Sequence, residues 1–174
     1  MKKILSLFLI AATVMLLVFL PGCNNDENSD DGGYYNYGLH YKIPEDYRHI
    51  TVDFSEYTYY NGEAYFYFTY MSAETFVEND LPADISVEAY ANEFRVINSI
   101  TSPVKYDKEN NTALIEYVYY YTEADEVQLP PEFFYHYFLR GSELLYIVTM
   151  NCPEDKAEEY KPIFNEWMKD IRAD

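Results

Sequence analysis

The first 23 residues constrain this chain most, because they decide which part of it is left to fold. Two lysines precede a run of seventeen uncharged residues, from Ile4 to Leu20, and the small residue Gly22 follows shortly after. A basic start, an apolar stretch and a small residue at its end are typical of a secretory signal peptide. Residues 1–22 are therefore expected to be removed, which leaves 152 residues, enough for one domain with a sizeable core. The alternative is an uncleaved anchor, since about 17 to 25 apolar residues can span a bilayer.

The residues at the end of this stretch, Leu20-Pro21-Gly22-Cys23, resemble the bacterial lipobox. The resemblance implies cleavage after Gly22, diacylglycerol on Cys23 and export as a lipoprotein. Pro21 departs from the usual pattern, where Ala or Ser is commoner, and we expect it to lower the efficiency of cleavage. The expected location is the outer face of the cell membrane, or the periplasm if the cell has two membranes.

The charge of the chain argues against two classes of partner. It carries 30 acidic and 12 basic residues, two of the basic ones in the signal, so the mature chain has a net charge near −20. Nucleic acid and anionic lipid headgroups would be repelled, because binding to phosphates depends on Lys and Arg replacing counterions. The acidic surface either keeps an exported protein soluble or attracts cations and basic partners, and the sequence leaves both open.

Two short observations set the limits of the folded part. Asn24 to Gly33 reads NNDENSDDGG and has no apolar residue to bury, so residues 23–36 are expected to be a disordered tether and residues 37–174 a single domain. Cys23 and Cys152 are the two cysteines of the chain. If Cys23 carries lipid, Cys152 is a free thiol, and the domain is expected to fold without a disulfide, as a monomer.

Patterns of apolar residues predict an α+β domain. Asn61-Gly62 indicates a tight hairpin turn with positive φ at both residues, and Ser86 is a good N-cap for the one dependable helix before the C-terminus. Residues 72–83 are expected to be an irregular crossing in which Ser72 caps at most a brief helical turn. The predicted strands are 39–43, 50–54 with 56–60 along the same rim, 64–71, 103–106, 113–121, 133–140 and 144–150, and the first helix is 87–98.

The long strands are apolar on both faces, so the sheet needs cover on both. In 113–121, Ile115 and Tyr117 belong to one face and Leu114 and Val118 to the other. A C-terminal helix is expected to supply cover, with Pro162 kinking it or starting a second helix. Its apolar stripe consists of Tyr160, Ile163, Phe164, Trp167, Met168 and Ile171.

These segments together resemble the PsbP-like domains, which share a fold with the Ran-binding Mog proteins. The resemblance covers about residues 39 to 172 and lies in LHYKIPEDY, AYFYFTY, SVEAYANEF and LYIVTMNCPEDKAEEYKPIFNEWMKDI. It implies a central antiparallel sheet covered by helices on its faces, and a role in binding or scaffolding. It contains no catalytic signature, so it assigns no role to any residue of this chain.

The search for catalytic chemistry is negative. His40, His49 and His136 have no paired spacing, and His136, between two tyrosines, is interpreted as a sheet histidine rather than a metal ligand. No serine-nucleophile elbow or phosphate-binding glycine loop occurs. Cys152 is interpreted as a buried structural cysteine. No metal, no cofactor and no enzymatic activity are expected.

Tyrosine is the residue that stands out, with 21 copies. Tyrosine either fills a half-wet sheet face or forms an exposed aromatic face for a glycan or a protein, and the sequence leaves both open. The exposed face would consist of Tyr57, Tyr59, Tyr65, Tyr67, Tyr117, Tyr119 and Tyr121, of which the binding residues would be Tyr65, Tyr67, Tyr117, Tyr119 and Tyr121.

The sequence thus favours a membrane-anchored exported lipoprotein that acts as a non-catalytic binding or assembly module at the cell envelope. The alternative is an envelope glycan-binding protein that uses the tyrosine face, and a hydrolase is a third and weaker hypothesis.

Overall fold

The computed structural model describes residues 27–28, 33–52, 55–122 and 129–174. The signal stretch, Cys23 and residues 24–26 and 29–32 of the expected tether lie outside them. Among the described residues, no helix is both long and apolar enough to cross a membrane.

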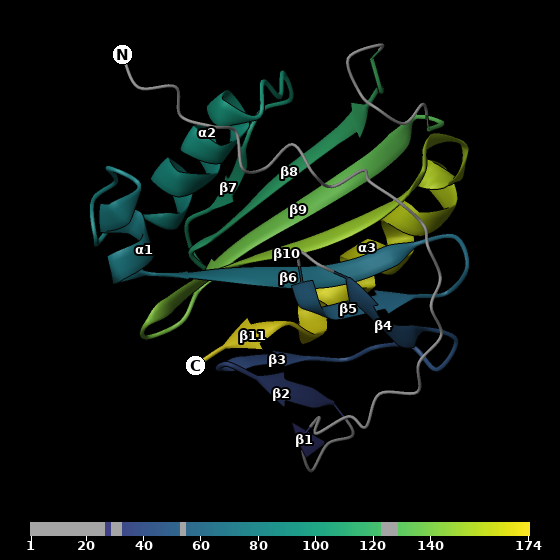
Figure 1. Ribbon diagram of the computed structural model, residues 1–174, viewed down its shortest axis with the longest axis horizontal. Helices are drawn as coiled ribbons and strands as arrows, with labels where there is room; N and C mark the ends of the chain where they lie inside the picture. Colours follow the sequence, from purple (N-terminus) through teal and green to yellow (C-terminus); the bar gives the residue numbers. More distant parts are fainter. Residues whose placement is uncertain (1–26, 29–32, 53–54, 123–128) are drawn as a thin grey trace.

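Within the described residues, seven antiparallel strands form the main sheet (Figure 1). They are β4 (Arg48–Val52), β5 (Ser55–Tyr60), β6 (Tyr65–Ser72), β7 (Lys105–Asp107), β8 (Thr112–Tyr119), β9 (Glu132–Arg140) and β10 (Leu144–Pro153). Their order across the sheet is β4-β5-β6-β10-β9-β8-β7. The predicted strands of this sheet are all present, and the predicted fold class, α+β with a central antiparallel sheet, is confirmed.

One face of the sheet, which we call the α2 face, packs against α1 (Ala73–Glu78) and α2 (Val87–Ile97). It is formed by the odd-numbered residues of β6, β8 and β10 and the even-numbered residues of β9, because residues directly opposite in a ladder share a face. The side chains buried between the two helices and this face of the sheet are Phe76, Ile85, Val87, Tyr90, Ala91, Ile100, Ala113, Ile115, Phe138, Leu145 and Ile147.

The opposite face, the α3 face, is covered by α3 (Ala157–Asp170) and by a second, small sheet. That sheet has the order β1-β2-β3-β11, from β1 (Glu27–Asn28), β2 (Tyr34–Asn36), β3 (Leu39–Tyr41) and β11 (Arg172–Ala173). Figure 1 shows it beside α3, at the bottom of the view. The largest side chains buried here are Tyr41, Tyr59, Phe66, Phe68, Tyr135, Tyr146 and Phe164. The prediction that both faces are covered by helices is therefore correct.

Local capping explains where the first two helices begin. The Ser86 hydroxyl accepts a hydrogen bond from the Ala89 N–H at 3.1 Å, which satisfies one of the unpaired donors of α2. Ser72 does the same for α1 through Thr75 at 3.2 Å. The segment that follows Ser72 is thus a six-residue helix rather than an irregular crossing. Phe76, fully buried under α2, holds this short helix in place.

The turn after β5 differs from the predicted one. Gly62 has a positive φ of +104°, but Asn61 is not among the residues with positive φ, as a primed two-residue turn would require. The Asn61 carboxamide oxygen instead accepts hydrogen bonds from the N–H groups of Glu63 and Ala64, at 3.1 and 2.9 Å. This Asx-type loop makes the hairpin connection longer than predicted.

The folded part starts earlier than residue 37, and the C-terminal helix does not break at Pro162. Tyr34 in β2 stacks on Tyr41, with ring centroids 5.5 Å apart, so this aromatic contact holds residues 34–36 in the fold.

The predicted C-terminal helix begins with a 3₁₀ turn, η1 (Glu154–Lys156), and α3 then continues through Pro162 without a break. Pro162 is on the exposed side of α3, where water can satisfy the carbonyl that loses its donor.

Candidate binding face

The tyrosines selected from the sequence lie mainly on the half of the α2 face that α1 and α2 leave open. Figure 1 shows both helices gathered at the left end of the sheet, and no described helix lies over the other end of this face. Tyr65, Tyr67, Tyr117 and Tyr119 point to this side and are all half-buried. We call this set the tyrosine face.

The register shows how the four tyrosines are arranged. Tyr65 and Tyr117 belong to one row across the sheet, in which Asn151 and Phe134 lie between them. Three strand spacings of about 4.8 Å separate the two tyrosines, so the row is roughly 14 Å wide. Tyr119 follows two residues after Tyr117 on the same strand, and its ring meets the Tyr121 ring edge-on at 5.0 Å between centroids.

Two residues of the predicted face do not belong to it. Tyr57 and Tyr59 point to the α3 face, because β5 pairs with β6 so that Thr58 is opposite Tyr67. Tyr59 is 2% exposed and its hydroxyl lies 3.1 Å from that of Tyr41. Tyr57 stacks on Phe68 at 4.9 Å. Tyr59 is a core residue and Tyr57 packs half-buried against the core on the α3 face, so this part of the prediction is wrong.

A stack of aromatic and imidazole rings extends from the tyrosine face to α2. Tyr117 stacks on Phe134 with centroids 5.4 Å apart and an interplanar angle of 15°, and Phe134 stacks on His136 at 5.7 Å and 18°. Phe94 of α2 meets the His136 ring edge-on at 5.0 Å. The stack therefore connects the open half of the face to the helix-covered half.

His136 is a structural residue of the sheet, as interpreted from the sequence. Its Nδ1 atom lies 2.9 Å from the Thr149 hydroxyl and its Nε2 atom 3.2 Å from the Tyr117 hydroxyl. The side chain is 5% exposed, and burial lowers its pKa to about 3. The imidazole is therefore neutral near pH 7 and holds two neighbouring hydroxyls in place.

Glu132, which the sequence reasoning missed, adds a carboxyl group to one end of the face. The Tyr121 hydroxyl donates to one carboxylate oxygen, and the Asn151 amide donates to the other at 3.2 Å. Burial raises the pKa of Glu132, while these two hydrogen bonds act in the opposite direction. The only hint in the sequence was position: Glu132 shares its parity on β9 with Phe134 and His136.

The phenols of the face are hydrogen-bond donors at neutral pH. Burial is the main cause that raises the pKa of Tyr65, to about 12, and it also raises the pKa of Tyr67 and Tyr117. Glu132 adds to all three shifts through its negative charge. The face thus offers aromatic rings, protonated hydroxyls and one carboxyl group, a combination suited to stacking and hydrogen bonding with a ligand.

The remaining candidate groups are remote from this face. Cys152 is fully buried on the α3 face, and burial first, then Glu132, raises its thiol pKa to about 12. His40 Nε2 lies 3.1 Å from an Asp174 carboxylate oxygen, and His49 meets the Tyr59 ring edge-on. In the part of the chain that the structure describes, no cluster of three or more His, Cys, Asp or Glu could hold a metal ion.

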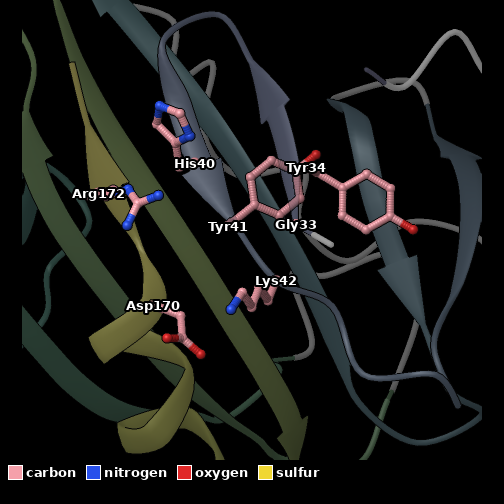
Figure 2. A pocket seen from close by; sticks show the side chains of 7 residues that line it. All are labelled: Gly33, Tyr34, His40, Tyr41, Lys42, Asp170 and Arg172. Carbon is pink, nitrogen blue, oxygen red and sulfur yellow. The ribbon is translucent and has the colours of Figure 1, made fainter. Parts of the chain in front are cut away.

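Two hollows lie away from the rows of the tyrosine face or at its border. The first, between β3, β11 and the end of α3, measures about 10 Å³, which is room for one water molecule. Figure 2 shows its lining, Gly33, Tyr34, His40, Tyr41, Lys42, Asp170 and Arg172. The second measures about 420 Å³ and lies where β8 meets the start of α3. Of these two, only the second has room for part of a ligand, and no sequence pattern predicted it.

No protein-family model matches this chain, and no curated protein matches it. A crystal structure from Bacteroides thetaiotaomicron VPI-5482 is similar at 9% identity and a TM-score of 0.49, over 79% of this chain and 45% of that chain. This chain therefore spans less than half of that protein. The solution structure of cyanobacterial PsbP (CyanoP) from Synechocystis sp. PCC 6803 is similar at 10% identity and a TM-score of 0.49, over 79% of this chain and 87% of that chain. Likenesses at this level carry no information about what this chain binds.

Proposed function

We propose that this chain is an exported lipoprotein, anchored through Cys23, whose domain is a non-catalytic binding or assembly module at the cell envelope. One observation carries the binding role: Tyr65, Tyr67, Tyr117 and Tyr119 gather, half-buried, on the part of a sheet face that no described helix covers. The residues before Cys23 carry the anchoring role, through their resemblance to the lipobox.

A tyrosine-rich sheet face suits a partner protein for a physical reason. Tyrosine buries a large ring and keeps a hydroxyl for hydrogen bonding, which is why it is enriched among the residues that dominate binding energy. The Tyr117, Phe134 and His136 rings are already stacked, so little side-chain freedom is lost on binding. The expected partner is a protein of the envelope.

An envelope glycan is the second candidate, and one observation favours it. Asn151 lies within the row between Tyr65 and Phe134, and its amide donates a hydrogen bond to Glu132. Aromatic rings stack on the apolar faces of sugars, and carboxyl and amide groups hydrogen-bond with their hydroxyls. The two candidates differ in which fraction of the envelope the protein should bind.

The same geometry argues against catalysis on this face. Both nitrogens of His136 are engaged, and its low pKa leaves no proton to donate near pH 7. The Cys152 thiol, with its raised pKa, is buried on the other face.

The test compares variants of the full-length protein for binding to two envelope fractions, purified wall glycan and solubilised membrane protein. Tyr65→Ala with Tyr119→Ala is expected to lower affinity at least tenfold for one fraction, because hot-spot tyrosines contribute about 2 kcal/mol or more. The control is Tyr70→Ala, a tyrosine of β6 that is 39% exposed on the opposite face. Equal binding by all three proteins would rule the tyrosine face out.

The anchor has its own test. Cys23→Ala should abolish incorporation of labelled fatty acid and leave precursor or released protein. Labelling that persists in this variant would contradict lipidation at Cys23.

A further inference from the structure

β8 has a neighbour on its outer side over only part of its length. β7 pairs with Thr112–Leu114, and from residue 115 to 118 no described strand lies beside β8 (Figure 1). This open edge of β8, residues 115–118, contains neither Lys nor Pro, the residues that commonly protect an exposed edge from pairing.

The hydrogen-bond pattern of the sheet identifies which groups point outward from this edge. The Gly141 N–H donates to the Leu144 carbonyl at 2.9 Å, so these residues form a hydrogen-bonded pair at the end of the β9-β10 hairpin. Because hydrogen-bonded and non-hydrogen-bonded pairs alternate, the even-numbered residues of β9 bond to β8, and Ile115 and Tyr117 bond back to them. The N–H and C=O groups of Glu116 and Val118 therefore point away from the sheet.

A hollow lies along this edge. It measures about 420 Å³ and is bounded by residues 116–118 on one side and by the beginning of α3 on the other. Its lining is Ser102, Glu116, Tyr117, Val118, Phe133, Glu154, Ala157, Glu158 and Lys161. Glu116, Val118 and Phe133 belong to the α3 face, so the side chains on that side of an additional strand at the edge of β8 would reach into this hollow.

The lining has an excess of negative charge. Three carboxylates, of Glu116, Glu154 and Glu158, face one ammonium, that of Lys161. Lys161 is 3.6 Å from Glu158 and lies over the Phe133 ring, at 5.0 Å from its centroid. Lys105, the first residue of β7, is 3.0 Å from Glu116. These two pairs leave the lining with one more carboxylate than ammonium group. The whole chain has a net charge of −18, so the hollow favours a cationic guest.

We propose that the open edge of β8 binds an extended, cationic segment of a partner protein, which joins the sheet as a further strand beside Glu116 and Val118. Successive side chains of a strand point to opposite faces. Side chains on one side of the bound segment would meet the carboxylates of Glu116, Glu154 and Glu158. Side chains on its other side would meet Tyr117 and Tyr119. A segment that alternates Lys or Arg with apolar residues fits both sides, and backbone hydrogen bonds supply affinity, as in other cases of strand addition.

This inference goes beyond the tyrosine face. Its hydrogen-bonding groups belong to Glu116 and Val118, whose side chains lie on the α3 face. It shares Tyr117 and Tyr119 with the tyrosine face but requires neither the lipid anchor nor Tyr65, so its test variants change Val118, Glu154 and Glu158 instead.

The first experiment uses a synthetic probe, an end-blocked heptapeptide of alternating Lys and Val, with the full-length protein in detergent. Binding is followed by fluorescence anisotropy and by hydrogen exchange at single amides. The amides of Glu116 and Val118 should exchange at least tenfold more slowly with the peptide, whereas that of Tyr117, already bonded to β9, should change little. The control is the same peptide N-methylated at alternate residues, which has the same charge but cannot pair. Equal binding of the two peptides would overturn the proposal, since charge alone would then explain it.

The second experiment changes the protein. Val118→Pro removes the outward N–H, and proline is tolerated at such an edge position. It should weaken peptide binding about fivefold or more relative to Val118→Ala, which loses the side chain and keeps the N–H. Glu154→Gln with Glu158→Gln should also weaken binding at low salt, more than Glu74→Gln with Glu78→Gln on the distant helix α1. If Val118→Pro and Val118→Ala bind the peptide equally, the hollow is not the site. The same conclusion follows if the two double glutamine variants bind it equally. Should Val118→Pro fail to fold, the N-methylated peptide still decides the outcome.

Discussion

The hydroxyl of Tyr117 and the Nε2 atom of His136 lie 3.2 Å apart across the neighbouring strands β8 and β9. On its other side the imidazole reaches the Thr149 hydroxyl of β10, so one histidine bridges three strands. The tyrosine face and the buried sheet are therefore joined at His136. A change in the charge of this ring would disturb both.

The first prediction concerns pH. Burial lowers the pKa of His136 to about 3, whereas an unfolded histidine titrates near 6.5. Between these values the unfolded chain takes up a proton that the folded chain does not, so stability falls as pH falls through this window. Between pH 5.5 and 4, the wild type should lose about 1.4 kcal/mol per pH unit more than His136→Gln, as measured by urea unfolding. Equal slopes would mean that the ring protonates within the folded protein.

The sequence predicted the elements whose signals are local. The parity of residues 113–121 identified both faces of β8, and Ser86 located the start of α2. The small sheet could not be predicted, because β2 and β11 are three and two residues long and show no periodicity. Their pairing with β3 depends on the docking of α3, which is a long-range effect.

The tyrosine face was predictable in part, and one error in it was avoidable. Tyr65, Tyr67, Tyr117 and Tyr119 share a face because each pair alternates along one strand. Tyr59 does not belong to this face. The predicted two-residue turn would already have paired Tyr59 with Ala64, whose side chain points to the same face as that of Phe66. Glu132 was missed because its role depends on Asn151 and Tyr121, which come from other segments.

The second prediction concerns the thiol of Cys152. Because it is fully buried and its pKa is raised to about 12, it should resist iodoacetamide at pH 8 in the folded protein. In denaturant it should react completely. Mass spectrometry of Cys23→Ser, which leaves one cysteine, makes the measurement. A covalent dimer on a non-reducing gel would contradict both the burial and the expected monomer.

The third prediction concerns the helix that covers the α3 face. Trp167 is 8% exposed and meets Tyr47 and Phe66 edge-on, at 4.9 and 5.8 Å between ring centroids. Trp167→Ala should cost about 3 to 5 kcal/mol of unfolding free energy, by the usual cost of emptying an aromatic site. Circular dichroism is the readout, because the chain has a single tryptophan. Ile163→Ala, at a position 38% exposed on the same helix, should cost clearly less, and similar losses would mean that α3 is not anchored by its buried stripe.

The last prediction separates core from surface within the tyrosine face. Tyr117 stacks on Phe134, hydrogen-bonds with His136 and packs beside the core under α2. Tyr119 lies at the end of β8, two residues further on, where its ring meets the Tyr121 ring edge-on.

Tyr117→Ala should therefore lower the free energy of unfolding by about 2 to 4 kcal/mol, because it empties a partly buried site and leaves His136 without one partner. Tyr119→Ala should cost about 1 kcal/mol or less. Thermal melts of the two variants provide the comparison, and Tyr117→Phe isolates the hydroxyl. If both alanine variants lose stability equally, Tyr119 is also a core residue, and the binding face shrinks to β6 and its neighbours. If neither variant loses stability, the ring stack does not stabilise the sheet, and both tyrosines contribute to binding a partner rather than to folding.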